Sequence, residues 1–244
     1  MSAPRLRLSV LLAALVALLF VYPLFAGVGG GLGLFLSVVV LGVVRAVPAE
    51  NGREQAGALV LAAAHLGPVW AWDSGAPAWA LHAGLGAGVA FYGYAAVAVL
   101  RHLAAARRVT AEALYGAASV YLLLGVAWAV AFALLDALAP RSFTFPSPGG
   151  AVGASGFADY LYASLVTLTT LGYGDVLPTT RAARALVTAE AVAGVFYTTV
   201  VLARLVSVFA ARAAVDEGRA GRGRAGRGRH PEPAPPDGGA RVLD

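Results

Sequence analysis

The chain of 244 residues contains no cysteine and no lysine, and only 13% of its residues are charged. Without cysteine it can form no disulfide, no thiolate metal site and no cysteine nucleophile. The 13 carboxylates lie mostly in predicted loops and in the C-terminal tail. No residue pattern resembles a catalytic dyad, a triad or a phosphate-binding loop. The sequence therefore indicates neither an enzyme nor a resident cofactor.

Apolar residues dominate the chain. They make up 59% of it, and the mean hydropathy is +0.74, which lies outside the range of ordinary soluble domains. Six apolar segments are long enough to cross about 30 Å of hydrocarbon as helices. We predict an all-α membrane protein with six transmembrane helices, at approximately Leu8–Tyr22, Gly31–Val47, Gly57–Trp72, Ala78–Leu100, Ala113–Ala139 and Ala182–Ala211.

The connection between the fifth and sixth segments, Pro140–Pro178, is long and begins with Gly, Ser and Pro residues. It becomes apolar again from Phe157 to Leu171. This apolar run is too short to cross the membrane and return, so we predict a re-entrant helix rather than another span.

Arginine placement predicts the orientation, because cytoplasmic loops retain positive charge. Arg141, Arg181 and Arg184 fall on one side of the predicted membrane. The other side holds Arg5, Arg7, Arg45, Arg53, Arg101, Arg107, Arg108 and the arginines of the tail. We therefore predict a multi-pass protein of the cell membrane, with both termini in the cytoplasm and the re-entrant helix facing outward.

Two further features concern the membrane boundary. Trp70, Trp72 and Trp79 gather near one predicted outer boundary, as an interfacial aromatic belt does. Arg5 and Arg7 precede a short apolar run, so the first segment is alternatively a secretory signal. The absence of an A-x-A cleavage site argues against that alternative, and cleavage would leave the remaining topology unchanged.

The sequence TLTTLGYGD, residues 167–175, is the most specific polar stretch in the apolar part of the chain. We call it the strip. Irregular backbone is tolerated at membrane depth only where protein or a water-filled cavity covers it. Gly172 and Gly174 accept positive φ without a Cβ clash, so their alternation with other residues can direct successive carbonyls toward one axis. The strip therefore predicts a pore or a buried joint.

Within the strip, Thr170-Leu171-Gly172-Tyr173-Gly174-Asp175 closely resembles the signature of potassium channels, whose filters are four TVGYG loops. The resemblance extends over roughly 157–209, because FADYLYASLVTLTT is similar to the family's pore helix and EAVAGVFYTTVVLARLVSVF to its inner helix. It implies that K+ sites are lined by the carbonyls of Thr170, Leu171, Gly172 and Tyr173, with the Thr170 hydroxyl. Leucine replaces the family's valine, and we expect it to alter packing behind the filter without changing the carbonyl pattern.

The resemblance also implies an assembly. It is to six-transmembrane channels of bacterial type with one pore loop per chain, so four chains are needed for one filter. Potassium-uptake subunits resemble this pore but carry four degenerate loops in one chain, which disfavours them.

Several residues are expected to support the filter: Tyr162, Thr167, Gly174, Asp175 and Glu190. Glu190 lies about two turns into the sixth segment, where an ionisable side chain is expensive. It either braces the filter through a pore-helix hydroxyl such as that of Thr167, or makes a purely structural hydrogen bond. Many family members instead carry a carboxylate four residues before the filter threonine, where this chain has Val166.

The sixth segment also predicts an inner cavity and gate. Gly194 lies where the family often has a hinge glycine, although close helix packing explains a glycine there equally well. Thr198, Leu202 and Val206 follow at i, i+4 spacing on one helix face. We expect that face to line the cavity.

Together these features predict a homotetrameric, potassium-selective channel that conducts passively, with K+ as its permeant ion and no cofactor. We divide the chain into a four-helix peripheral membrane domain (1–110), a pore domain (111–213) and a disordered basic cytoplasmic tail (214–244). The tail either contacts anionic lipid of the bilayer or is a solvated positive flank, and nucleic-acid binding is not expected. The alternatives are a weakly selective cation channel and a non-conducting scaffold or accessory subunit.

Gating is expected to depend weakly or not at all on voltage. The six-span layout resembles voltage-gated relatives, whose fourth helix carries an arginine at every third position. Here the fourth segment, Ala78–Leu100, contains no arginine or lysine. It therefore offers little charge that could move through the membrane field.

Overall fold

The computed structural model describes residues 3–25, 31–46, 52–105, 111–145, 154–201 and 203–204. The chain divides into two compact units, Met1–Leu202 and Ala203–Asp244, and all the helices and strands named in the next paragraph belong to the first. The predicted tail (214–244) and two of the predicted gate residues, Leu202 and Val206, lie outside the described residues.

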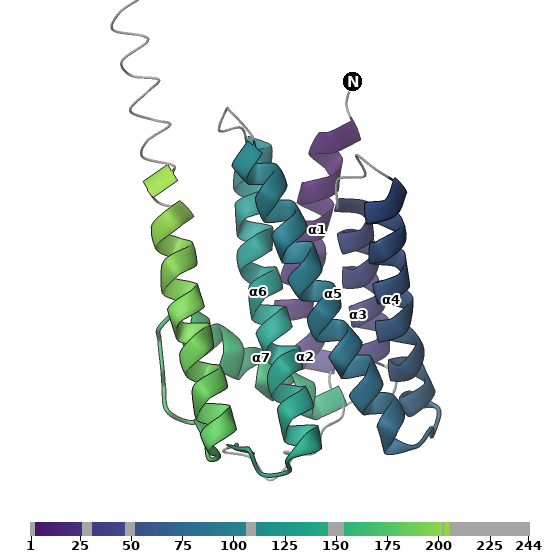
Figure 1. Ribbon diagram of the computed structural model, residues 1–244, viewed down its shortest axis with the longest axis vertical. Coiled ribbons are helices and arrows are strands. Elements are labelled where there is room, and N and C mark those ends of the chain that lie inside the picture. The colour runs from purple at the N-terminus through teal and green to yellow at the C-terminus, as the bar shows by residue number, and fades with distance from the viewer. Residues whose placement is uncertain are drawn as a thin grey trace, which may run out of the picture. The chain divides into compact units, whose positions relative to one another are not determined.

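The described part of the first unit is helical almost throughout, which agrees with an all-α membrane protein (Figure 1). In chain order its elements are α1 (Ala3–Phe20), α2 (Tyr22–Phe25), α3 (Gly31–Ala46), α4 (Gly52–Asp73), α5 (Ala78–Ala105), α6 (Ala111–Leu138), β1 (Phe143–Thr144), α7 (Ala154–Leu168), β2 (Leu177–Pro178) and the helix Arg181–Val201, here called the last helix. The two short strands pair antiparallel, with Phe143 opposite Pro178 and Thr144 opposite Leu177.

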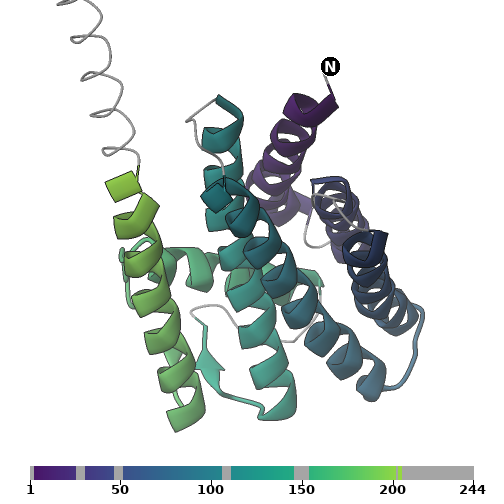
Figure 2. The same cartoon turned by 45° about the horizontal axis from the view of Figure 1, so that its top comes forward.

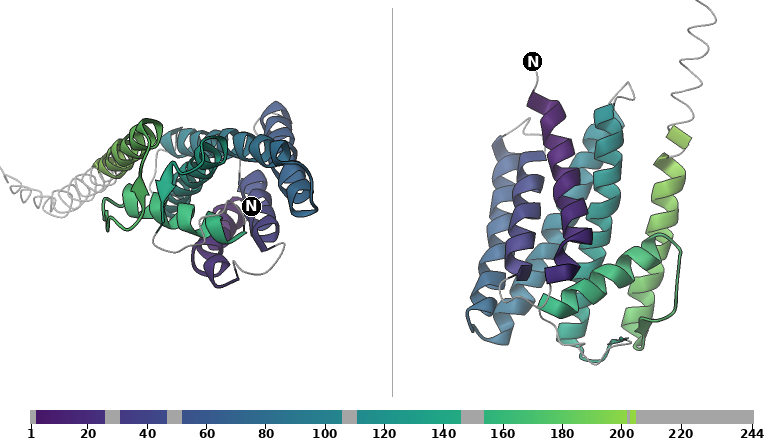
Figure 3. Two further views of the ribbon diagram at one scale, coloured as in Figure 1. Left: turned by 90° about the horizontal axis from the view of Figure 1, so that it is seen from below. Right: turned by 180° about the vertical axis from the view of Figure 1, so that it is seen from behind.

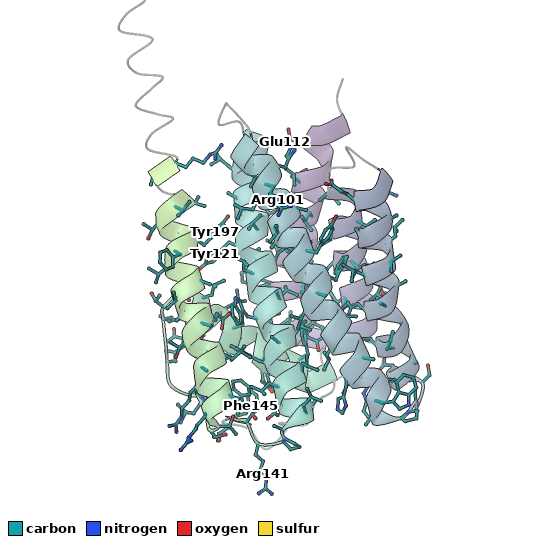
Figure 4. All side chains as sticks on the ribbon, viewed as in Figure 1. Arg101, Glu112, Tyr121, Arg141, Phe145 and Tyr197 are labelled. Carbon is teal, nitrogen blue, oxygen red and sulfur yellow. The ribbon has the colours of Figure 1, made fainter. Side chains whose placement is uncertain are left out.

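The long helices run up and down beside one another (Figures 1 and 2). One end of the bundle holds the start of α1, the end of α3, the start of α4, the end of α5 and the start of α6, and the other end holds the α4–α5 turn and the end of α6 (Figure 1). Arg101 and Glu112 lie at the first of these ends and Arg141 at the second (Figure 4). This alternation agrees with the predicted order of the spans, while the side that faces the cytoplasm stays a prediction.

Three helices in the described ranges are long and apolar enough to cross a membrane, namely Ala78–Leu103, Glu112–Leu138 and Arg181–Val201. They support the fourth, fifth and sixth predicted spans. The other predicted spans are helical but shorter or less apolar: α1 ends at Phe20 before the separate turn of α2, and α4 contains Glu54 in its first turn and Pro68 in its interior. The count of six spans stays a prediction.

Close glycine contacts join α4 to α5. A Cβ at Gly88 would lie 2.7 Å from the His65 ring, and one at Gly84 would lie 3.1 Å from the Val69 side chain. The His65 ring is fully buried, and its Nδ1 lies 2.8 Å from the Gly84 carbonyl oxygen. Because a carbonyl only accepts, Nδ1 donates this bond. His65 is therefore a packing residue of the α4–α5 pair.

The helix α4 ends in a Schellman motif, in which two backbone amides past the helix bind its last free carbonyls. The Ala76 N–H binds the Ala71 carbonyl at 3.0 Å, and the Gly75 N–H binds the Trp72 carbonyl at 2.9 Å. Gly75 has φ of 93°, a left-handed conformation that costs glycine nothing because it has no Cβ.

The helix α6 positions the site, because it packs against α1, α5 and α7. Figure 3 shows α7 lying obliquely to the long helices, near the end of the bundle where α6 ends. The strip continues directly from the end of α7.

Candidate functional site

The helix α7 also ends in a Schellman motif, and this one starts the strip. The Leu171 N–H binds the Val166 carbonyl at 2.9 Å, and the Thr170 N–H binds the Thr167 carbonyl at 2.9 Å. The residue in the left-handed position is Thr170, with φ of 59°. A β-branched residue at positive φ is a backbone outlier, and such outliers cluster at functional sites.

Positive φ then recurs at every second residue. Thr170, Gly172 and Gly174 have φ of 59°, 58° and 76°, and neither Leu171 nor Tyr173 between them has positive φ. A Cβ at Gly172 or Gly174 would meet nothing within 4 Å. Within the single chain, glycine is therefore needed at these positions for its backbone conformation and not for space.

The amide hydrogen bonds fix the direction of the carbonyls in the first part of the strip. The N–H groups of Leu171 and Gly172 both bind the Val166 carbonyl, at 2.9 and 3.3 Å. In a trans peptide the carbonyl points opposite to the N–H of the same peptide unit, and no cis peptide occurs in the described residues. The carbonyls of Thr170 and Leu171 therefore point away from the end of α7. These two successive carbonyls therefore share one direction, while their convergence on a common axis stays a prediction.

The Leu171 side chain is largely uncovered in the single chain. Its exposed fraction in the single chain is 54%, so the chain's own described residues cover only part of it, and its packing behind the filter stays a prediction. A cavity of about 160 Å³ adjoins the strip, and Leu171 is not part of its lining. The strip lines the cavity with Thr167, Gly172, Gly174 and Asp175, and Val176 follows directly after it. The rest of the lining comes from α6, α7, the last helix and the strands: Phe132, Phe143, Ala163, Val166, Pro178 and Val187.

A hydrogen bond ties the far end of the strip to α7. The Tyr162 hydroxyl donates to Asp175 Oδ2 at 2.6 Å, and the Val176 N–H donates to Asp175 Oδ1 at 3.0 Å. The bond from Tyr162 lowers the pKa of Asp175 below its ordinary value of 3.8. The same bond raises the pKa of Tyr162 to about 12. The pair therefore stays intact as carboxylate and phenol across the neutral range.

Glu190 binds α7, but not through Thr167 as the sequence suggested. The Thr167 hydroxyl donates to the Ala163 carbonyl at 2.8 Å, one turn back in its own helix. Glu190 is fully buried, and its Oε1 lies 2.5 Å from the Ser164 Oγ. Ser164 is also fully buried and contacts the Gly125 carbonyl of α6 at 2.8 Å.

Gly194 lets the last helix approach the end of α7. A Cβ there would lie 2.6 Å from the Leu168 carbonyl oxygen, so close packing accounts for this glycine and a hinge role stays a prediction. The Tyr121 hydroxyl of α6 donates to the same Leu168 oxygen at 3.1 Å. Tyr121 and Tyr197 lie side by side on α6 and the last helix, with ring centroids 5.7 Å apart (Figure 4). Thr198 is exposed and bonds the Gly194 carbonyl at 3.0 Å.

A buried carboxylate that was not predicted from the sequence ties α7 to the chain just after α6. Asp136, near the end of α6, accepts the Tyr160 hydroxyl at 2.6 Å and the N–H groups of Ser142 and Phe143 at 2.7 and 3.3 Å. Ser142 in turn accepts the Thr179 N–H through its carbonyl at 2.9 Å. Asp136 thereby links α6, α7 and both short strands. An acidic residue near the end of an apolar segment was its only sequence signal.

The comparison with known proteins points to the same region. Residues 114–211 match the model of a protein family described as "Ion channel". The match supports a passive ion channel. It covers α6 from Leu114 on, α7, the strip and the last helix, and leaves α1–α5 unmatched. No curated protein and no solved structure matches the chain.

Proposed function

We propose that four copies of this chain form a potassium-selective channel in the cell membrane and that K+ crosses it passively through the strips. The observation that carries the proposal is the alternation of positive φ at Thr170, Gly172 and Gly174, together with carbonyls that point away from α7. Rings of backbone carbonyls replace the hydration shell of K+ in filters of this kind. The carbonyls of 170–173 and the Thr170 hydroxyl are the proposed ligands.

The need for further copies rests on two observations. One chain contains one strip, and a ring of carbonyls needs several. The last helix is also poorly covered by its own chain. Of its most apolar stretch 11% is buried, against 50% for the corresponding stretch of α6 and 44% for that of α5. Its exposed apolar residues include Val192, Val195, Phe196 and Val200. Neighbouring copies and lipid are proposed to cover them, with Thr198 lining the inner cavity.

The proposed supports act at different places. Tyr162, through its bond to Asp175, holds the outer end of the strip. Glu190 acts on the other side of α7 through Ser164, and Gly194 lets the last helix reach the end of α7. Among the predicted supports, Thr167 contributes its carbonyl to the Schellman motif and lines the cavity.

Reconstitution tests the proposal. The purified full chain in liposomes with opposed K+ and Na+ gradients should give a reversal potential close to that expected for K+ alone, and cross-linking should give four chains per particle. Equal permeability to both cations would establish the weakly selective channel instead. No flux from correctly folded protein would favour a scaffold or accessory subunit.

A further inference from the structure

Glu190 and Ser164 form a short chain of hydrogen-bonding oxygens that joins three helices. Glu190 Oε1 on the last helix lies 2.5 Å from Ser164 Oγ on α7, which lies 2.8 Å from the Gly125 carbonyl oxygen on α6. Both side chains are fully buried. The second carboxyl oxygen of Glu190, Oε2, is also buried and has no hydrogen-bond partner among the described residues.

The number of protons available to the Glu190–Ser164–Gly125 hydrogen bonds decides whether Glu190 is protonated. The Gly125 carbonyl only accepts, and the Ser164 hydroxyl has a single proton to give. When Ser164 donates that proton to Gly125, its oxygen can only accept from Glu190, and the carboxyl must then carry a proton of its own. A charged Glu190 would compete with Gly125 for the one serine proton, and its Oε2, which has no donor among the described residues in either state, would then share the negative charge. A buried carboxylate with at most one hydrogen bond is costly, whereas a neutral acid satisfies both contacts.

Among the described residues, no charged side chain is hydrogen bonded to Glu190. From α6, the Tyr121 hydroxyl donates to the Leu168 carbonyl and not to Glu190. On its own helix, Tyr197 donates to the Ala117 carbonyl at 2.6 Å. On α7, Tyr160 and Tyr162 donate to Asp136 and Asp175, and Asp159 makes no described bond to Glu190. No arginine or histidine in the described ranges hydrogen bonds to either oxygen of Glu190.

We propose that Glu190 is a neutral carboxylic acid that donates its proton to Ser164, and that loss of this proton reduces conduction by uncoupling the last helix from α7. When Glu190 ionises, only one of the two hydrogen bonds remains, because the single Ser164 proton can go to either Gly125 or Glu190. The helix α7 carries the strip at its end, so its attachment affects the position of the strip. The effect on conduction rests on the proposed channel function. The protonation state of Glu190 does not.

The test compares the full chain with Glu190→Gln in liposomes while pH is raised from neutral. A glutamine amide can donate to Ser164 and cannot ionise. We expect the K+ flux of the unaltered chain to fall severalfold as pH rises, and that of Glu190→Gln to stay near its neutral value. Ser164→Ala removes the acceptor and should give a reduced flux that no longer depends on alkaline pH. Glu112→Gln, at the start of α6, is the matched control and should retain the fall.

A second measurement does not need conduction. The infrared spectrum of the folded chain at neutral pH should contain the carbonyl band of a buried protonated carboxyl, absent in Glu190→Gln, and this band should disappear as pH rises. Absence of the band at neutral pH, or an unchanged alkaline fall in the flux of Glu190→Gln, would overturn the proposal. The band without any K+ flux would refute the channel function and with it the effect on conduction, while leaving the protonated acid established.

Discussion

The ends of α4 and α7 have the same hydrogen-bonding pattern but different residues at the left-handed position. After α4 this residue is Gly75, with φ of 93°, and after α7 it is Thr170, with φ of 59°. The next residue's amide in each case reaches back to a carbonyl in the last turn of the helix, from Ala76 to Ala71 and from Leu171 to Val166. The threonine accepts a strained conformation, at a cost of roughly 1–2 kcal/mol, where glycine would accept it freely.

The segments that continue from the two helices explain the difference. After Gly75 the chain turns directly into α5, and the turn only has to connect two helices. After Thr170 it continues with two further positive-φ residues, and polar contacts hold both sides of this irregular segment, from Tyr162 to Asp175 and from Tyr121 to Leu168. Strain of this kind persists only where the surroundings determine the conformation. The comparison therefore identifies the end of α7 as a segment whose strained backbone is held by its surroundings, as the proposed filter requires.

The largest effect is expected from Gly172→Ala. The new Cβ meets no atom, so its cost is the left-handed conformation, about 1–2 kcal/mol per chain. Four chains would each bear it at the proposed filter, and we expect loss of K+ selectivity, measured as reversal potential under bi-ionic conditions. Gly75→Ala is the matched control, because it imposes the same kind of strain at φ of 93° outside the strip. It should lower thermal stability and leave selectivity unchanged; a selective Gly172→Ala channel would contradict the carbonyl assignment.

Thr170→Gly should act in opposite directions on stability and function. Relief of the strained φ should raise the free energy of unfolding by about 1–2 kcal/mol. The added freedom of glycine in the unfolded chain should lower it by about 0.5–1 kcal/mol. We expect a net rise in stability of roughly 1 kcal/mol, seen as a higher unfolding temperature, with weaker K+ selectivity because the hydroxyl is lost. Thr169→Gly, at a residue without positive φ, should lower the unfolding temperature. A fall in both variants would mean that Thr170 is not strained.

The sequence was sufficient to predict the helices and the strip. Apolar length identified the helices that became α5, α6 and the last helix, because a membrane-spanning helix needs a long apolar run. The glycines at positions 172 and 174 predicted positive φ there, because positive φ favours residues without Cβ. The positive φ of Thr170 could not be predicted this way, since nothing in the local sequence indicates that a threonine takes the left-handed position.

The contacts around the strip were harder to predict. Ser164 and Thr167 are both hydroxyl residues of α7, and which one meets Glu190 depends on how the last helix lies against it. Asp136 gathers donors from positions 142, 143 and 160, which no local pattern brings together. Such contacts depend on tertiary packing, and a single sequence contains little information on it.

Tyr162→Phe should give a smaller, pH-dependent effect. The bond from Tyr162 lowers the pKa of Asp175 below 3.8, so its contribution is complete above that pH and is lost as pH falls through the lowered value. In the unaltered chain we expect selectivity to persist to unusually acid pH and then decline. The variant should lose part of its selectivity already at neutral pH and decline further at a higher pH than the unaltered chain. Tyr115→Phe, an exposed tyrosine at the start of α6, is the control; if both variants behave alike, the Tyr162–Asp175 bond does not hold the strip.

The smallest effect is expected from removing the charges at the end of α5. A voltage sensor needs charges that move through the field, each worth about 2.3 kcal/mol per 100 mV. Within α5 no arginine or lysine precedes Arg101, which lies at the end of the bundle with Glu112 (Figure 4). Arg107 and Arg108, which follow Arg101 in the sequence, lie outside the described residues.

The α4–α5 pair is closely packed through Gly84, Gly88 and His65, which favours a fixed α5 over a moving one. Neutralising Arg101, Arg107 and Arg108 together should leave the slope of the conductance–voltage relation shallow and unchanged. A steep conductance–voltage relation that this triple change abolishes would show that α5 is a voltage sensor and not a fixed packing element.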